Sequence, residues 1–98
     1  KQLIHVQKRY VIAYDIVDNK KRNKVANFIK NYGIRVQKSV FECHIPSDTM
    51  QNLINKLEKM IDLENDSILV YCMCKDCFAN RTGIGTYISN DEKDYKIV

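Results

Sequence analysis

The sequence contains few of the residues that break a chain or staple it. It has one proline, three glycines, no tryptophan and four cysteines in 98 residues. Three of the cysteines cluster late in the chain, unlike the disulfide framework of a small secreted protein. No apolar run approaches the length of a membrane span, and residues 1–9 lack the pattern of a signal peptide. We therefore expect a cytoplasmic protein without a membrane partner.

The size and composition are those of one small globular domain. Ninety-eight residues suffice for one domain, and 45% hydrophobic with 29% charged residues excludes a disordered tail. A core of this size leaves a thin margin of stability, which a second copy or a partner surface would increase. We predict a single domain over residues 1–98.

Positive charge is concentrated in the first part of the chain. Residues 1–38 contain ten Lys/Arg against two Asp/Glu, a net charge of +8, whereas residues 39–98 carry −4. This asymmetry indicates a polyanionic partner such as nucleic acid; the alternative is a solvated basic helix face. The cations predicted to contact phosphate lie on a loop, a helix and a strand: Lys20, Lys21, Arg22, Lys24, Arg35 and Lys38.

Hydrophobic patterning predicts alternating strands and helices. Residues 10–14 are a continuous apolar, β-rich run, typical of a central strand. Apolar residues then recur with helical spacing until Gly33, which should end that helix. Residues 34–45 are rich in β-formers and predict one long second strand. The later elements predicted are a helix with an apolar stripe over residues 50–61, a strand at 68–72, and shorter strands at 86–88 and 95–98.

Although one long strand is predicted between the two helices, we assign the chain to the order β-α-β-β-α-β with extra strand material at the C-terminus. That order is typical of the α+β class and of a ferredoxin-like sandwich. In this fold the first and third strands lie side by side at the centre of the sheet. Since the fold hosts many functions, function must be argued from the site.

Asp15 is the main candidate for chemistry. It follows the apolar strand directly, so it should lie at the rim of the sheet near the charges of Arg22 and Lys24. Mg²⁺ takes oxygen ligands and usually needs one or two protein carboxylates. One aspartate per chain is too few for a metal cage, but two Asp15 residues facing each other across a two-fold axis would suffice, with waters and phosphate completing the shell. The alternative is that Asp15 or Asp18 merely caps the first helix.

The cysteines Cys72, Cys74 and Cys77 form a C-x-C-x-x-C cluster. The spacing of the last two occurs in zinc knuckles, but a structural zinc site needs four ligands. We interpret the cluster as a buried or reduced thiol pair and assign no metal, leaving open whether these thiols bind a metal or form a disulfide. No Ser-His-Asp or Cys-His constellation can be defended from the sequence.

Three segments resemble the CRISPR-associated (Cas) protein two family, the small partner of the CRISPR adaptation integrase. The segments are YVIAYDI at residues 10–16, KKRNKVA at 20–26 and YGIRVQKSVFE at 32–42. The run QKSVFE within the third segment is the most specific element. The resemblance covers about residues 9–98, and residues 1–8 precede the usual start of the family.

The resemblance implies a homodimer in which a C-terminal strand of each chain adds to the other's sheet. It implies a role in spacer acquisition, in which the dimer holds a DNA duplex and bridges the integrase. Several family members are described as metal-dependent endonucleases acting on RNA or double-stranded DNA, with Mg²⁺ or Mn²⁺ as cofactor. In these, the catalytic, metal-binding aspartate corresponds to Asp15. The basic positions of the family fall on Arg22, Lys24 and Arg35, its packing aromatic on Phe41 and the neighbouring hydroxyl on Ser39.

Three functions follow from this pattern. The first is a structural adaptor that binds duplex nucleic acid through its phosphates without catalysis. The second is a hydrolase that cuts double-stranded DNA or single-stranded RNA with a metal ion held by paired Asp15 residues. The third is a toxin-like ribonuclease of the same fold, against which the stretch 35–42 argues.

Overall fold

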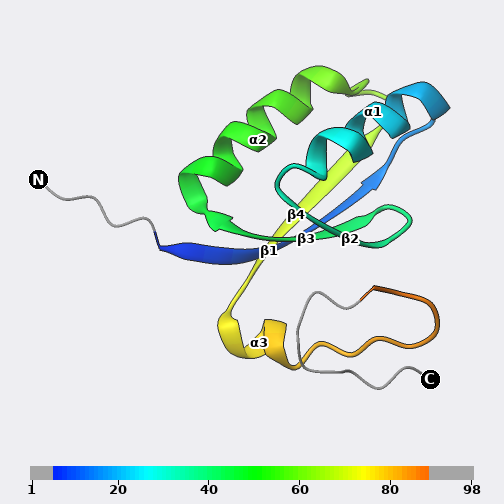
Figure 1. Ribbon diagram of the computed structural model, residues 1–98. Coiled ribbons are helices and arrows are strands. Elements are labelled where there is room, and N and C mark those ends of the chain that lie inside the picture. Colours follow the sequence, from blue (N-terminus) through cyan, green and yellow to red (C-terminus); the bar gives the residue numbers. More distant parts are fainter. Residues whose placement is uncertain (1–5, 89–98) are drawn as a thin grey trace, which may run out of the picture.

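A computed structural model of the chain describes residues 6–88 (Figure 1). The predicted α+β class and the order β-α-β-β-α-β are confirmed, with one short helix added after the last strand. No helix within residues 6–88 is long and apolar enough to cross a membrane. The elements are β1 (Gln7–Asp15), α1 (Asn19–Ile29), β2 (Gly33–Gln37), β3 (Val40–Pro46), α2 (Ser47–Met60), β4 (Ser67–Met73) and α3 (Lys75–Ala79).

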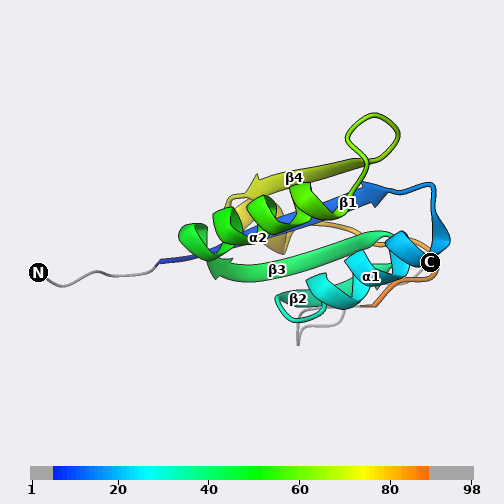
Figure 2. The same cartoon turned by 90° about the horizontal axis from the view of Figure 1, so that it is seen from above.

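The four strands form one antiparallel sheet in the order β2-β3-β1-β4. At its centre Ile12 of β1 lies opposite Phe41 of β3 on one side and Val70 of β4 on the other. The first and third strands are therefore neighbours, as predicted. Helices α1 and α2 cover one face of this sheet, whereas α3 and the chain up to residue 88 lie below the other face (Figures 1 and 2).

The core lies between the sheet and the two long helices. Alternate residues of β1, namely Tyr10, Ile12 and Tyr14, are buried on this side, as the two-residue period of a strand requires. Leu53 and Leu57 of α2 pack into the same cluster. The intervening residues of β1 lie on the opposite face, which we call the open face.

The prediction of one long strand over residues 34–45 is wrong. The chain reverses at Lys38 and Ser39, so β2 and β3 form a hairpin. The register shifts between Arg35 and Gln37, which is a β-bulge that gives β2 one extra residue. The Arg35 guanidinium closes the turn by donating two hydrogen bonds to the Lys38 carbonyl oxygen.

Gly33 opens β2 where the backbone of β3 comes too close for a side chain. A Cβ atom at this position would collide with the Glu42 carbonyl oxygen and with the Cys43 sulfur. The helix that Gly33 was predicted to end stops earlier, at Ile29, and a turn closed by the Tyr32 N–H on the Ile29 carbonyl oxygen leads into the strand.

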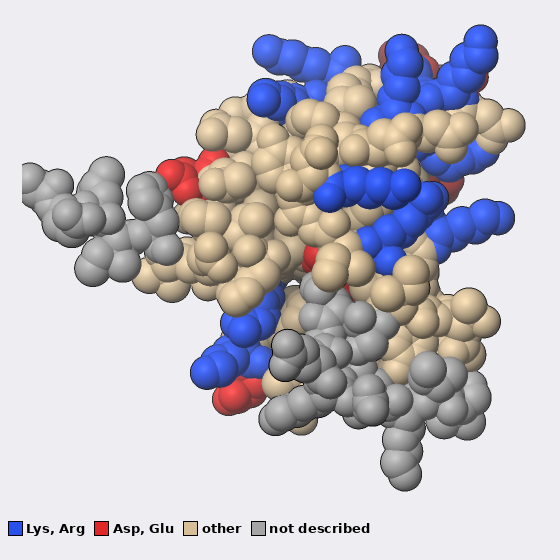
Figure 3. Space-filling model, viewed as in Figure 1, with Lys and Arg blue, Asp and Glu red and all other residues tan. Residues whose placement is uncertain are grey.

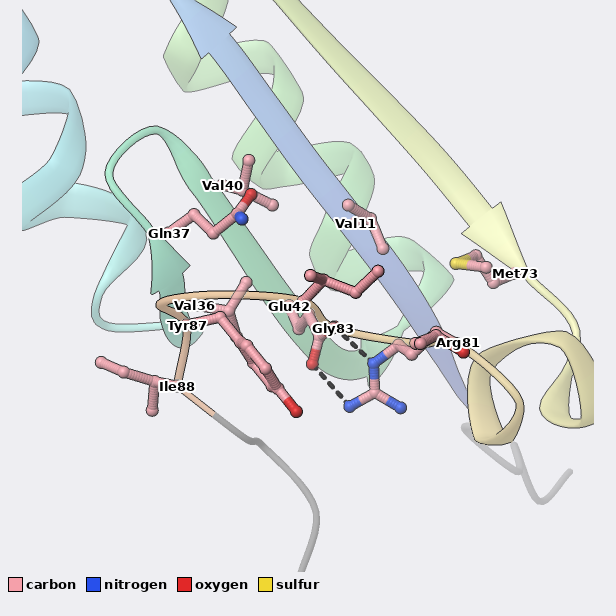
Figure 4. A pocket seen from close by; sticks show the side chains of 12 residues that line it. Val11, Val36, Gln37, Val40, Glu42, Met73, Arg81, Gly83, Tyr87 and Ile88 are labelled. Carbon is pink, nitrogen blue, oxygen red and sulfur yellow. Dashed lines mark hydrogen bonds and ion pairs between the residues drawn. The ribbon is translucent and has the colours of Figure 1, made fainter. Parts of the chain in front are cut away.

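The prediction of a strand at residues 86–88 is also wrong. Residues 81–88 form an irregular segment, and Ile88 donates one backbone hydrogen bond of 3.0 Å to the Val36 carbonyl oxygen. A single bond does not make a ladder. The segment is held on the open face by Arg81, whose guanidinium pairs with the Glu42 carboxylate at 2.5 and 2.8 Å (Figure 4). The predicted strand at 95–98 and its exchange between chains lie outside the described residues.

Candidate functional site

The end of β1, the start of α1 and the turn between β2 and β3 enclose a polar pocket of about 520 Å³. This pocket brings together residues that are far apart in the sequence, which we call the Asp15 pocket. The predicted site residues that line it are Asp15, Arg22, Arg35, Lys38 and Ser39. The sheet topology explains this meeting, because β3 lies between β2 and β1 and so places the hairpin turn beside the end of β1.

Asp15 is the last residue of β1 and is exposed, opposite Ser67 of β4. The strand end is fixed by Tyr14 and Ile16, which are both buried. Asp18, rather than Asp15, caps α1: its carboxylate accepts the Lys21 N–H at 2.8 Å. The capping alternative therefore applies to Asp18 and not to Asp15.

Main-chain carbonyl groups hold the two arginines of the pocket. The Arg35 Nε and Nη2 atoms donate to the Lys38 carbonyl oxygen at 3.0 and 2.6 Å. The Tyr14 hydroxyl donates to the same oxygen at 3.2 Å. Arg22 donates from Nη1 to the Ile16 carbonyl oxygen at 3.0 Å. A guanidinium group has five N–H donors, so these bonds orient each arginine and leave donors for a phosphate.

The other predicted cations lie away from the Asp15 pocket. Lys20 and Lys24 are exposed on α1 but do not line the pocket. Lys21 lies closer to the loop before β4. There, hydrogen bonds from the backbone N–H groups of Val17 and Asp62 lower the pKa of the Asp66 carboxyl group, and the charge of Lys21 adds to this effect. Figure 3 shows basic side chains over α1 and beside the hairpin turn, with further ones elsewhere on the same face.

Phe41 and Ser39 support the pocket from within. The Phe41 ring is fully buried, with its centroid 6.2 Å from that of Tyr14 and 5.9 Å from the guanidinium carbon of Arg35. The Ser39 carbonyl oxygen accepts the Tyr14 N–H at 3.1 Å, which ties the hairpin turn to β1. Phe41 therefore packs against Arg35 from inside the protein, and its ring is not accessible for stacking with bases.

Two residues of the pocket, Asn19 and Asn23, were missed by the sequence analysis. They are four residues apart on α1, so they share one face of the helix. Both carry carboxamide oxygens, which are suitable ligands for a hard cation or its water shell. The available signal was the helical spacing: Arg22 follows Asn19 by three residues, so both side chains lie on neighbouring positions of one helix face.

The Asp15 pocket fits Mg²⁺ in the type of its ligands but not in their number. Carboxylate, carboxamide and hydroxyl oxygens are the donors that Mg²⁺ prefers. Within residues 6–88, however, no three His, Cys, Asp or Glu side chains are grouped to hold a metal. Among the described residues that line the pocket, Asp15 is the one carboxylate; the expected two-fold arrangement of Asp15 residues would add a second.

Comparisons with known proteins agree on one family. The family model described as CRISPR associated protein Cas2 matches residues 8–81. A Rhodospirillum rubrum protein named CRISPR-associated endoribonuclease Cas2 4 is 44% identical over 80 residues, which are 82% of this chain and 64% of that protein. The match thus spans slightly less than two thirds of that relative.

Solved structures show the same similarity. The crystal structure of Streptococcus pyogenes Cas2 at pH 6.5 matches with a TM-score of 0.69 and 29% identity, covering 74% of this chain and 94% of that one. A chain of a partial Cas6-RT-Cas1–Cas2 complex matches with a TM-score of 0.65 and 31% identity, covering 76% of this chain and 87% of that one.

Proposed function

Because this chain belongs to the Cas2 family, we propose that it acts in CRISPR adaptation as a homodimer that binds duplex nucleic acid and bridges the integrase. The similarity to a chain of a complex whose name includes both Cas1 and Cas2 supports the integrase as partner.

The observation that carries the proposal is the fixed positive charge of the Asp15 pocket. Arg22 and Arg35 are oriented by carbonyl groups, and Lys38 projects from the turn that Arg35 closes. Cations placed in this way bind phosphates and position a duplex without reading its sequence. The exposed Lys20 and Lys24 extend the same charge along α1.

The open face supports a homodimer. Leu69 and Tyr71 of β4 remain 55% and 53% exposed there, opposite Ala13 and Val11 of β1. Exposed apolar side chains on neighbouring positions of a sheet favour burial against another surface. Asp15 follows in the same alternation along β1. A second copy packed on this face would therefore bring its own Asp15 towards this one.

A second candidate function is phosphodiester hydrolysis, since the relatives carry names such as endoribonuclease and endonuclease. In this function Asp15 would hold a divalent cation, with Asn19 and Asn23 contacting its water shell. A bound cation would activate water and stabilise charge on the phosphodiester. Arg22 and Arg35 would bind the phosphate oxygens and so fix the scissile bond beside Asp15.

Duplex binding is tested by reversing two charges on α1. The double variant Lys20→Glu, Lys24→Glu should bind a short DNA duplex more weakly and with a shallower salt dependence. The matched control is Lys56→Glu, Lys59→Glu, which reverses two exposed lysines on α2 and gives the same net charge. Equal loss of binding in both variants would mean that total charge, and not this surface, governs affinity.

Hydrolysis is tested by Asp15→Asn, which keeps the shape of the side chain and removes its charge. Cleavage of RNA and of duplex DNA should require Mg²⁺ or Mn²⁺ and should be lost in the variant, while duplex binding and spacer acquisition in cells persist. If the unaltered protein shows no metal-stimulated cleavage at any pH tested, the hydrolase function is rejected and the adaptor function stands alone.

A further inference from the structure

The cysteines of this chain occupy two different environments. Cys43 is buried in the core, and this burial, with the nearby charge of Glu42, raises the pKa of its thiol to about 11. Cys72, Cys74 and Cys77 are exposed free thiols rather than a buried pair. The core thiol is therefore protonated and shielded, whereas the other three can meet reagents from solution.

Cys74 and Cys77 lie on one turn of backbone. Cys74 is the residue before α3, and its sulfur accepts the Cys77 N–H at 3.3 Å. The two thiols are also close enough for the Cys77 thiol to lower the pKa of Cys74, and for Cys74 to raise the pKa of Cys77. A three-residue step at the start of a helix thus already brings the sulfurs together, so a bond between them requires no movement of the sheet.

The two thiols differ in acidity. Hydrogen bonds from the Cys77 N–H and from the Cys77 thiol lower the pKa of Cys74. The hydrogen bond with Cys74, followed by the charge of Cys74, raises the pKa of Cys77. Cys74 is thereby the better nucleophile at neutral pH, and Cys77 is placed to attack any bond that Cys74 forms.

Cys72 stands apart from this pair. It lies opposite Tyr10 in the ladder between β1 and β4, on the face of the sheet that carries the helices. The pKa of the Tyr10 hydroxyl is raised by burial and, to a lesser degree, by Cys72. Among residues 6–88 no three metal-ligating side chains are grouped, so Cys72 does not complete a zinc site with the other two.

We propose that Cys74 and Cys77 form a redox-active dithiol, which low-molecular-weight disulfides oxidise reversibly to an intramolecular disulfide. The Cys74 thiolate attacks one sulfur of the small disulfide; the bond between its two sulfurs breaks, and one small thiol leaves. The Cys77 sulfur then attacks the sulfur of Cys74 in the mixed disulfide and releases the second small thiol. Two cysteine thiols are oxidised, one small disulfide is reduced to two thiols, and the cysteine protons end on these products.

The disulfide would act at the junction between the sheet and the segment on the open face. Phe78, directly after Cys77, is buried, with its ring centroid 5.7 Å from the guanidinium carbon of Arg9 and 3.7 Å from that of Arg81. Arg81 in turn holds Glu42 of β3 (Figure 4). The new bond would stiffen the single turn that leads into this cluster and leave the sheet as it is. This inference does not depend on the proposed function.

The test uses the full chain, reduced and then equilibrated in its folded state with oxidised glutathione. We expect the loss of two thiols per chain, a Cys74–Cys77 linkage in peptide mapping by mass spectrometry, and full recovery with dithiothreitol. Cys72→Ser should lose the same two thiols. Cys77→Ser should instead accumulate one glutathione on Cys74, because no second sulfur can displace it.

Two results would overturn the inference. One is glutathione attached to all three exposed cysteines at similar rates with no intramolecular bond, which would make them ordinary surface thiols. The other is purified protein that holds one zinc ion per chain through these thiols. Peptide mapping of the unaltered chain gives a decisive answer even if a serine variant fails to fold.

Discussion

Replacing Lys38 with alanine should remove one positive charge from the Asp15 pocket and leave its framework in place. The side chain of Lys38 is exposed, whereas its carbonyl oxygen receives the bonds from Arg35 and Tyr14. Alanine keeps that carbonyl group. Any change in duplex binding can therefore be assigned to the lost charge, and the thermal unfolding midpoint should be unchanged.

The size of the effect follows from counterion release. One phosphate contact contributes about 0.9 to the slope of log affinity against log salt concentration. At about 0.1 M monovalent salt, losing it weakens binding roughly eightfold, or by about 1.3 kcal/mol. If both chains of a homodimer contact the duplex, the slope changes by about 1.8 and binding weakens roughly 60-fold.

Fluorescence anisotropy of a labelled duplex, measured over a series of salt concentrations, gives both quantities. Two unrelated duplex sequences should lose affinity equally, since a phosphate contact carries no sequence information. Lys59→Ala, on the exposed side of α2, is the control with the same net charge. A salt slope that Lys38→Ala leaves unaltered would refute the assignment of phosphate binding to this pocket.

Three further predictions concern stability, measured by urea unfolding. Gly33→Ala should lower the free energy of unfolding by about 1–3 kcal/mol, because its methyl group would meet the Glu42 carbonyl oxygen; an unchanged midpoint would contradict that contact. Glu42→Gln should cost roughly 1.5–3 kcal/mol through the lost ion pair with Arg81, whereas the exposed control Glu58→Gln should cost almost nothing; equal effects would mean that the ion pair adds no stability. Burial raises the pKa of Cys43 from 9.0 to about 11. Between these pH values the thiol is deprotonated in the unfolded chain but still protonated in the folded chain. The free energy of unfolding should therefore fall as the pH rises through this range. Cys43→Ala should show a shallower fall over the same range, and equal slopes would refute the shift.

The central part of the fold could be predicted from local patterns alone. The apolar run at residues 10–14 lies within β1. This strand is covered by helices on one face and has a neighbouring strand on each side, β3 and β4, so it needs apolar residues along its length. The helical stripe over residues 50–61 became the buried side of α2 for the same reason.

The hairpin within residues 34–45 could not be predicted in this way. Lys38 and Ser39 form its turn, and neither is a residue that marks a tight hairpin, such as asparagine followed by glycine. The turn is instead stabilised by the Arg35 side chain on a main-chain oxygen. Because β-forming residues lie on both sides of this turn, the sequence pattern of the hairpin is the same as that of one continuous strand.

The site was predicted only in part, for a related reason. Charge and resemblance identified Asp15, Arg22 and Arg35, because these side chains carry the expected chemistry themselves. The roles of Asn19 and Asn23 depend on the face of α1 that meets the sheet edge, which is a tertiary property. The position of Lys21 near Asp66 likewise depends on a loop 45 residues further along the chain.

The use of a main-chain oxygen as the anchor of the pocket has an evolutionary consequence. Every residue supplies the same main-chain carbonyl group, and proline alone has its backbone dihedral fixed by a ring, so the residue at position 38 can vary while Arg35 and Tyr14 keep their anchor. Selection could thus adjust the charge of the pocket, and with it the proposed affinity for a duplex, through this one side chain. A mutation at Arg35, by contrast, would remove the side chain that closes the turn, so it would alter the geometry of the pocket together with its charge. Natural selection therefore has less freedom at position 35 than at position 38.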